Sequence, residues 1–161
     1  MLPTLVMFLT FCCSEGVVAQ VLTLAGTPWN LTISAADVTD AGLDIPSEYS
    51  SAANQSEFNF YYAGVNKNYT WSVEVSKSDV NWPAGVQLAL RRTGPGSEYL
   101  HSGSIDNGLS YITLTSVDQA FFDGKRGRID VPIQYRLSNL SVTIPAGTYS
   151  TVVTYTITSS L

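Results

Sequence analysis

The sequence predicts an all-β protein, an immunoglobulin-like antiparallel β-sandwich of seven or eight strands. From Trp29 onward, apolar residues recur with a period of two, and no window keeps the 3.6-residue period of an amphipathic helix. The alternating runs are short and are separated by Gly, Pro and Asn turns, a spacing typical of two packed sheets. The chain has 161 residues, which is enough for one domain with a full core.

The composition is typical of extracellular β proteins. Charged residues make up only 13% of the chain, so its polarity is carried mostly by neutral hydroxyl and amide groups. The net charge is -5, and Lys and Arg are scattered along the chain. Nucleic acid is therefore not expected as a partner, because a phosphate-binding surface needs clustered cations.

Four strands are expected in the first half of the chain, at residues 29–34, 58–62, 69–76 and 86–90. The loop between the first two is rich in Ser, Ala, Asp and Asn and has room for a short helical turn. In the third strand, Trp71 alternates with valines, which predicts that its side chain lies in the core.

The second half begins with a turn signal, Asp106-Asn107-Gly108, that leads into a strand at residues 111–115. Residues 118–123 resemble a helical turn that places Phe121 or Phe122 under the sheet. Residues 129–137 show the cleanest alternation in the chain. Pro132 falls within them, and its missing N–H favours an edge strand or a bulge.

The first nineteen residues predict a secretory signal peptide, with an apolar run over residues 2–13 and small residues up to Ala19. A retained anchor or a structural strand is the alternative, although the apolar run falls short of the ~20 residues that span a bilayer. Phe11 is too large for the position before a lipidated cysteine. Cys12 and Cys13 both lie in this segment, so the mature chain is expected to have no disulfide and no reactive thiolate.

The last predicted strand follows the segment IPAGTYS, which begins at Ile144. Pro145 ends the preceding segment, and Gly147 can adopt a positive φ. Immunoglobulin-like sandwiches often place a tyrosine at such a position and bond its hydroxyl to nearby backbone. Tyr149 fits this role, which predicts that the strand is the penultimate one of the fold. Thr151 is expected to share one face of this strand with four larger residues: Tyr149, Val153, Tyr155 and Ile157.

This Pro-Ala-Gly-Thr-Tyr-Ser run with its alternating Val and Thr, together with the leader, resembles the secreted pilin and spore-coat-U-like subunits of chaperone–usher systems. The resemblance implies an incomplete sandwich, with an acceptor edge at the four residues just named, that takes an extended strand from the next subunit. It also implies that the partners are other copies of the chain in a homopolymer, a periplasmic chaperone and an outer-membrane usher.

Residues 20–28 are the candidate donor strand or N-terminal extension, and residues 29–161 are the expected sandwich domain. In the donor, Val21, Leu22 and Leu24 would contact the neighbouring subunit, and Gly26 to Pro28 offer a hinge. The alternative is that the same residues fold back as the first strand of a closed sandwich.

An enzyme is not expected, because the residue types that catalysis needs are nearly absent. His101 is the only histidine and lies in a predicted loop. No His or Cys cluster has metal-ligand spacing, and no nucleophile elbow or phosphate loop is present. We therefore predict no catalytic residue, no cofactor and no metal. A calcium site at Asp37, Asp40, Asp44 and Glu48 is the weaker alternative to turn-forming residues.

Aromatic side chains suggest a second function, a secreted carbohydrate-binding or adhesive module that acts as a monomer on surface glycans. Trp82, which lies beside Pro83 in a predicted loop, is the main candidate for sugar contact, together with Tyr61 and Tyr62. Lys125, Arg126 and Arg128 are expected at a solvated hairpin tip, with docking of an acidic partner as the alternative.

Four sequons, at Asn30, Asn54, Asn68 and Asn139, matter only if the secreting cell glycosylates them. The first expectation is a secreted, cell-surface structural subunit of an extracellular filament, pilus or surface layer, which assembles by donor-strand exchange or edge-strand pairing. The monomeric sugar-binding module is the second.

Overall fold

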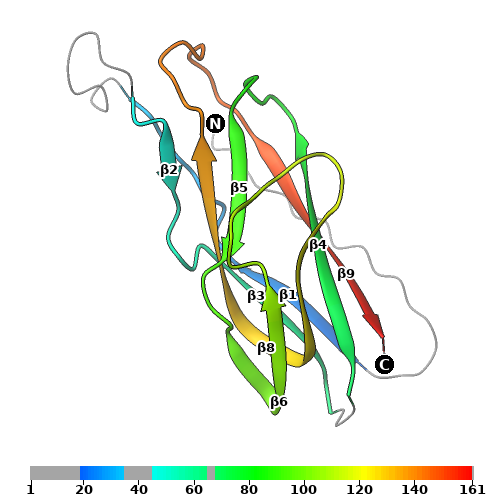
Figure 1. Ribbon diagram of the computed structural model, residues 1–161. Coiled ribbons are helices and arrows are strands. Elements are labelled where there is room, and N and C mark those ends of the chain that lie inside the picture. Colours follow the sequence, from blue (N-terminus) through cyan, green and yellow to red (C-terminus); the bar gives the residue numbers. More distant parts are fainter. Residues whose placement is uncertain (1–18, 35–44, 65–67, 161) are drawn as a thin grey trace.

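The structure, a computed structural model, describes residues 19–34, 45–64 and 68–160. These residues form nine β-strands and no helix, all in one antiparallel sheet that curls on itself (Figure 1). Within these ranges, accordingly, no helix is long and apolar enough to cross a membrane. The all-β class predicted from the sequence is confirmed.

The strands are β1 (Gln20–Gly26), β2 (Glu48–Ser50), β3 (Ser56–Tyr62), β4 (Thr70–Asp79), β5 (Gln87–Arg92), β6 (Ser97–Asn107), β7 (Ile112–Thr113), β8 (Gln119–Ser138) and β9 (Thr151–Ser160). The main path through the sheet is β1-β3-β8-β4-β9, so β1 and β9 lie at its two ends. β2, β5 and β6 pair with β8 beside this path, and β7 pairs with β5.

The twenty-residue strand β8 organises the whole sheet, because five other strands pair with it. Its first part, residues 119–125, pairs with β4, and β6 pairs with residues 122–125 and 127–129. Its later part pairs with β3 and β2 and with β5. Gly124 lies where the strands approach closely, since a Cβ atom there would come within 2.5 Å of the Trp71 ring. Arg126 and Asp130 have positive φ between the two parts and bend the strand.

The curl brings the inner faces of β3 and β4 together around an aromatic core. Phe58 lies 6.0 Å from Trp71 and 5.2 Å from Phe122, measured between ring centroids. Phe58 and Phe60 are fully buried, and Trp71 is 3% exposed, as its alternation with valines predicts. Each such aromatic side chain removes ~150 to 250 Å² from water, so this cluster holds the sheet in its curled form.

Most of the predicted strands are confirmed, but residues 29–34 are extended without being part of a strand. The pairing of β1 with β3 ends at Gly26 opposite Ser56, which is the first residue of β3. Pro28 also lacks the N–H that a ladder would need. The segment instead lies beside a groove that is described below.

The predicted helical turn at residues 118–123 is wrong, because β8 begins there. Phe121 and Phe122 are consecutive and both buried, which breaks the alternation that marks a strand. A register shift opposite Val73 and Glu74 explains this, since a bulge allows two neighbouring side chains to face the same way.

The expected hairpin tip at Lys125 to Arg128 is also wrong, because these residues lie in the middle of β8. Arg128 is only 7% exposed, and its guanidinium donates to the carbonyl oxygen of Gly103. An edge strand at Pro132 is likewise wrong, because β8 is central in the sheet and Pro132 faces Glu57 in the ladder with β3. The nearest irregularity is the register shift between Phe58 and Phe60, which begins one residue away at Val131.

Candidate functional site

Among the described strands, β9 lies at one edge of the sheet. It pairs with β4 over ten consecutive residues without a register shift, from Asp79 opposite Thr151 to Thr70 opposite Ser160. Among the described residues no second strand pairs with β9. Proline and charged residues usually keep an edge strand from pairing with another chain, and β9 contains neither.

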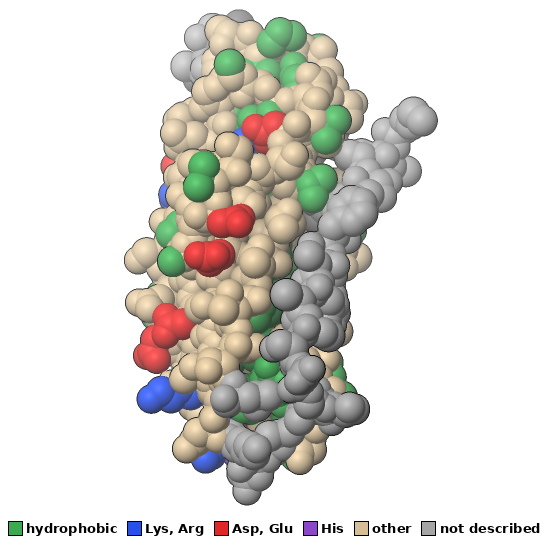
Figure 2. Space-filling view, turned by 90° about the vertical axis from the view of Figure 1, so that its right-hand side faces the viewer, with side chains coloured by type: hydrophobic (Ala, Val, Ile, Leu, Met, Phe, Trp, Pro, Cys, Tyr) green, Lys and Arg blue, Asp and Glu red, His purple; other side chains and the backbone are tan. Residues whose placement is uncertain are grey.

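Figure 2 shows the side of the molecule that carries β4 and β9 in Figure 1. Where Figure 2 shows described residues, uncharged polar side chains and backbone cover most of this side, with scattered hydrophobic side chains, a few Asp and Glu, and Lys or Arg toward one end. Because charged side chains are sparse on this side, electrostatic repulsion would do little to keep a second β-strand away.

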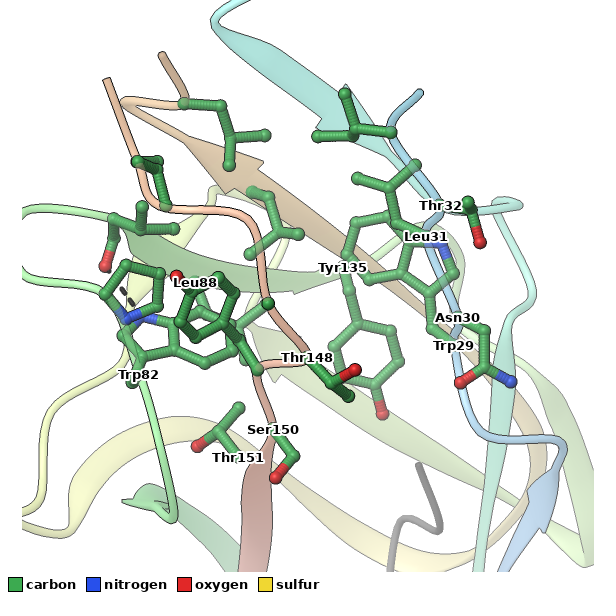
Figure 3. A pocket seen from close by; sticks show the side chains of 18 of the residues that line it. Trp29, Asn30, Leu31, Thr32, Trp82, Leu88, Tyr135, Thr148, Ser150 and Thr151 are labelled. Carbon is green, nitrogen blue, oxygen red and sulfur yellow. Dashed lines mark hydrogen bonds between the residues drawn. The ribbon is translucent and has the colours of Figure 1, made fainter. Parts of the chain in front are cut away.

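An apolar groove with a volume of about 900 Å³ lies at the beginning of β9. One wall is the extended segment of residues 27–34, and the other is the chain of residues 140–151 that leads into β9. The floor includes Leu88 from β5 and Leu137 from β8. Figure 3 shows Trp29 and Leu31 on one side of this groove and Trp82 on the other, with Tyr135 between them. Predominantly apolar grooves of this size are where proteins take up ligands or segments of other chains.

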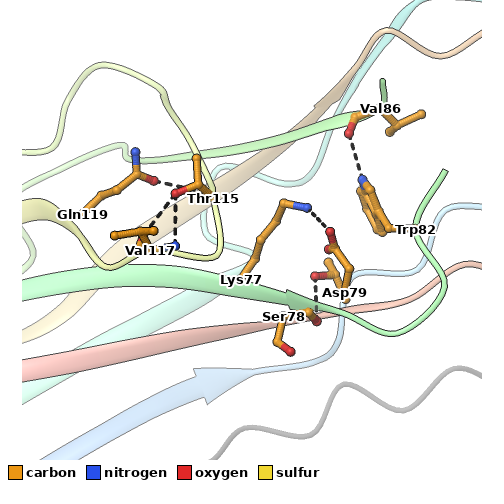
Figure 4. Close-up of polar contacts among 9 residues, drawn as sticks. Lys77, Ser78, Asp79, Trp82, Val86, Thr115, Val117 and Gln119 are labelled. Carbon is orange, nitrogen blue, oxygen red and sulfur yellow. Dashed lines mark hydrogen bonds and ion pairs between the residues drawn. The ribbon is translucent and has the colours of Figure 1, made fainter. Parts of the chain in front are cut away.

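Trp82 is half-buried at one end of the groove and held there by its surroundings. Its indole Nε1 donates to the carbonyl oxygen of Val86 at 2.8 Å (Figure 4). The Lys77 ammonium lies 5.2 Å from the centroid of the Trp82 ring and forms an ion pair with Asp79 at 2.5 Å. The cation over the ring and the hydrogen bond fix the indole as a rigid part of the wall.

A chain of buried hydroxyl groups lies below the groove. The Tyr135 and Tyr155 hydroxyls are 2.9 Å apart, and the Tyr135 hydroxyl is 3.1 Å from Oγ of Ser56. Burial raises the pKa of both tyrosines above the usual value of 10.0. The Trp29 ring stacks on Tyr135 with its centroid 6.4 Å away. These contacts couple the groove wall to the core.

The tyrosine before β9 has the contact that the sequence predicts. The Tyr149 hydroxyl donates to the carbonyl oxygen of Pro145 at 2.6 Å. Gly147 does not adopt a positive φ, so that part of the prediction is wrong. Within β9, Val153 and Tyr155 are buried, with only 6% and 7% of their surface exposed, and Ile157 packs against the core. These three residues therefore share the inner face, as expected.

The candidate donor segment forms β1, which pairs in register with β3 of the same chain from Gln20 opposite Tyr62 to Gly26 opposite Ser56. Leu22 and Leu24 pack against the core, and both side chains, like that of Val21, are half-buried. β1 does not pair with β9. Its role between subunits stays a prediction.

The three residues proposed for sugar contact do not come together. Tyr61 stacks on Tyr99 with the centroids 3.7 Å apart. Tyr62 is only 7% exposed, and its hydroxyl lies 2.7 Å from that of Ser159, near the end of β9. Trp82 lies in the groove near the beginning of β9. The two tyrosines and Trp82 are thus separated by nearly the length of that strand.

The remaining candidate residues are partly outside the described ranges, and those within them lie apart from one another. Asp37, Asp40 and Asp44 lie outside the described residues. Glu48 forms an ion pair with Arg136 at 3.7 Å, and His101 lies half-buried in β6. In the part of the chain that the structure describes, no three His, Cys, Asp or Glu side chains are placed to hold a metal ion.

Comparisons with protein-family models, with curated proteins and with solved structures found no match to this chain. The resemblance to pilin-like subunits therefore rests on the residues quoted above.

Proposed function

We propose that the protein is a structural subunit of an extracellular filament or surface layer, and that it assembles with copies of itself by strand exchange or edge-strand pairing. In this proposal the curled sheet is an incomplete immunoglobulin-like sandwich that a strand from the next copy completes. The observation that carries the proposal is strand β9, which leads out of an apolar groove and over its ten residues pairs with β4 alone among the described strands.

Energetics support coupling between folding and assembly. Trp29, Leu31 and Trp82 line the groove and are only half-buried, and Ile33 is 36% exposed. Full burial of a large apolar side chain stabilises by ~1.5 to 3 kcal/mol. Several such side chains are together comparable with the ~5 to 15 kcal/mol stability of a domain. An inserted strand would also satisfy the outer backbone groups of β9.

The geometry also favours an open assembly. The acceptor edge is β9, whereas the candidate donor is the segment at the other end of the sheet. A contact between two different surfaces of the same chain is heterologous, and it produces a filament unless the rotation between copies closes a ring. This distinguishes the proposal from a simple twofold dimer.

The test is the assembly state of the purified protein, by size-exclusion chromatography and negative-stain imaging. We expect rods or concentration-dependent oligomers. Thr156→Lys places a charge on the exposed side of β9 and should reduce assembly. Ser72→Lys is the matched control, because it adds the same charge to β4, which is paired on both sides. A native protein that stays monomeric at all concentrations, or equal effects of both variants, would argue against the proposal.

The donor is tested separately with a synthetic peptide of residues 20–34. If this segment completes the groove of another copy, the peptide should raise the melting temperature. A peptide with Leu22 and Leu24 replaced by Ser is the control. An unchanged melting temperature would support self-closure of the sheet by β1 instead.

A second function, binding of a sugar by the monomer, is favoured by one observation: Trp29 and Trp82 line the same groove. Aromatic rings on the walls of a groove can stack on sugar rings. A monomeric peak that binds glycans, and loses this binding in Trp82→Ala, would support it.

A further inference from the structure

A cluster of polar and charged side chains lies on the face of the sheet opposite the groove. Arg136 alternates along β8 with Tyr135 and Leu137, which line the groove, so its side chain leaves the other face. Its guanidinium carbon lies 4.1 Å from the centroid of the Tyr111 ring. The guanidinium carbon of Arg91 lies 4.8 Å from the same centroid. We call Arg91, Tyr111, Gln134 and Arg136 the arginine–tyrosine platform.

Gln134 holds two parts of the platform in place. Its Oε1 accepts hydrogen bonds from Nε of Arg91 at 3.1 Å, from Nη2 of Arg91 at 2.9 Å and from the Tyr111 hydroxyl at 2.9 Å. Its Nε2 donates to the carbonyl oxygen of Ser51 at 3.0 Å. The Gln134 side chain is therefore anchored at both ends, so Arg91 and Tyr111 are preorganised.

Arg136 keeps unused hydrogen-bond donors. Its nearest acid is Glu48, with Oε2 at 3.7 Å from Nη1, which is beyond hydrogen-bond distance, and the Glu48 side chain is 56% exposed. The Nε of Arg136 is buried and has no hydrogen-bond partner within the described ranges. Two guanidinium groups thus share one ring, while one exposed carboxylate offsets their charge.

We propose that the arginine–tyrosine platform binds an acidic glycan through its carboxylate or sulfate groups. A guanidinium presents its donors in a planar fork that matches either anion, and stacking on Tyr111 fixes the plane of the fork. The backbone groups of β5 and β8 are already paired in the ladder between them. Between these two described strands a peptide would find no free edge to pair with, whereas a sugar chain needs only side chains.

Because the chain is negatively charged overall, binding to a polyanion would indicate a specific cationic site. The whole chain carries a charge of -5, so general electrostatic attraction opposes contact with a polyanion. Binding therefore requires a local cationic site. The platform does not involve the groove or β9, so this inference stands or falls independently of assembly.

The experiment measures binding of the full chain to immobilised polygalacturonate, dextran sulfate and neutral dextran at physiological salt. We expect binding to at least one of the two anionic polymers and none to dextran. A preference for polygalacturonate identifies carboxylate as the ligand group, and a preference for dextran sulfate identifies sulfate. Absence of binding to both would overturn the proposal.

Two variants with the same loss of charge complete the test. Arg136→Gln should weaken binding by about ten-fold or more, the effect expected for one charge-assisted contact. Lys125→Gln removes an exposed cation of β8 outside the platform and should change binding less than about two-fold. Melting curves establish that both variants fold. Equal weakening of binding by both variants would overturn the proposal. Self-association that is sensitive to salt and that Arg136→Gln abolishes would also overturn it, because the ligand would then be an acidic segment of a second copy.

Discussion

The pair of buried tyrosines below the groove gives the sharpest prediction for stability. Tyr135 and Tyr155 are 5% and 7% exposed, and their hydroxyls form a chain with Ser56. Tyr155→Phe removes the hydroxyl at one end of this chain. Tyr135→Phe removes the middle hydroxyl. The two substitutions delete the same chemical group, but they leave different hydroxyls without a partner.

The magnitudes follow from the number of groups left unpaired. After Tyr155→Phe, the Tyr135 hydroxyl keeps Ser56, so the expected loss is one net hydrogen bond, ~0.5 to 1.5 kcal/mol. After Tyr135→Phe, both bonds are lost and the buried Tyr155 hydroxyl has no other partner among the described residues, which adds ~1 to 3 kcal/mol. The double variant has no unpaired hydroxyl at residue 155, so it should be more stable than Tyr135→Phe alone.

Urea unfolding followed by tryptophan fluorescence measures all three variants, and their free energies form a double-mutant cycle. The reasoning is refuted if Tyr155→Phe costs as much as Tyr135→Phe, or if the double variant is the least stable of the set. Either result would mean that Tyr155 has another hydrogen-bond partner in solution.

The same pair predicts a loss of stability at high pH. Burial raises the pKa of Tyr155 well above 10.0 in the folded state, and that of Tyr135 is also raised. The unfolded chain ionises first, near pH 10, so the stabilisation is complete below that pH and falls as the pH rises toward the folded pKa values. The double variant should lose less stability between pH 9 and 11 than the native protein, with pH-dependent melting curves as the measurement.

Three further substitutions test the core and the approach to β9. Phe58→Ala should cost ~3 to 5 kcal/mol in urea unfolding, because the ring is fully buried. Gly124→Ala should cost ~1 to 3 kcal/mol, since its Cβ would lie 2.5 Å from the Trp71 ring; a variant as stable as the native protein would show that the ring can move away. Tyr149→Phe should cost ~0.5 to 1.5 kcal/mol through loss of the bond to Pro145, and a melting temperature equal to that of the native protein would contradict this.

Strands with regular alternation were predictable from the sequence, and those with irregular patterns were not. β4 and β9 each bury one face, so their apolar residues mark them. β6 does not show this pattern, because most of its side chains are half-exposed or exposed and its pairing with β8 shifts between Tyr99 and Ser104. The start of β8 is hidden for a different reason, the two consecutive buried residues Phe121 and Phe122.

The candidate sites depend on register, which the sequence does not reveal. Trp82 stood out as a loop aromatic, but only the structure places it across a groove from Trp29. The arginine–tyrosine platform draws on β5 and β8 and on Tyr111, just before β7. Arg91 faces Gln134 in the ladder between β5 and β8, a pairing that could be found only by knowing which strands are neighbours.

The dependence of the sheet on β8 has a consequence for how the chain acquires its structure during synthesis. β2 to β6 all emerge from the ribosome before β8, yet all five of them pair directly with it. Until β8 begins to emerge at residue 119, the ladders available to the described strands are those of β1 with β3 and β5 with β7. Nearly the whole nascent chain must therefore wait with unpaired backbone and exposed aromatic rings, which makes folding slow and gives a holding chaperone a long period in which to act.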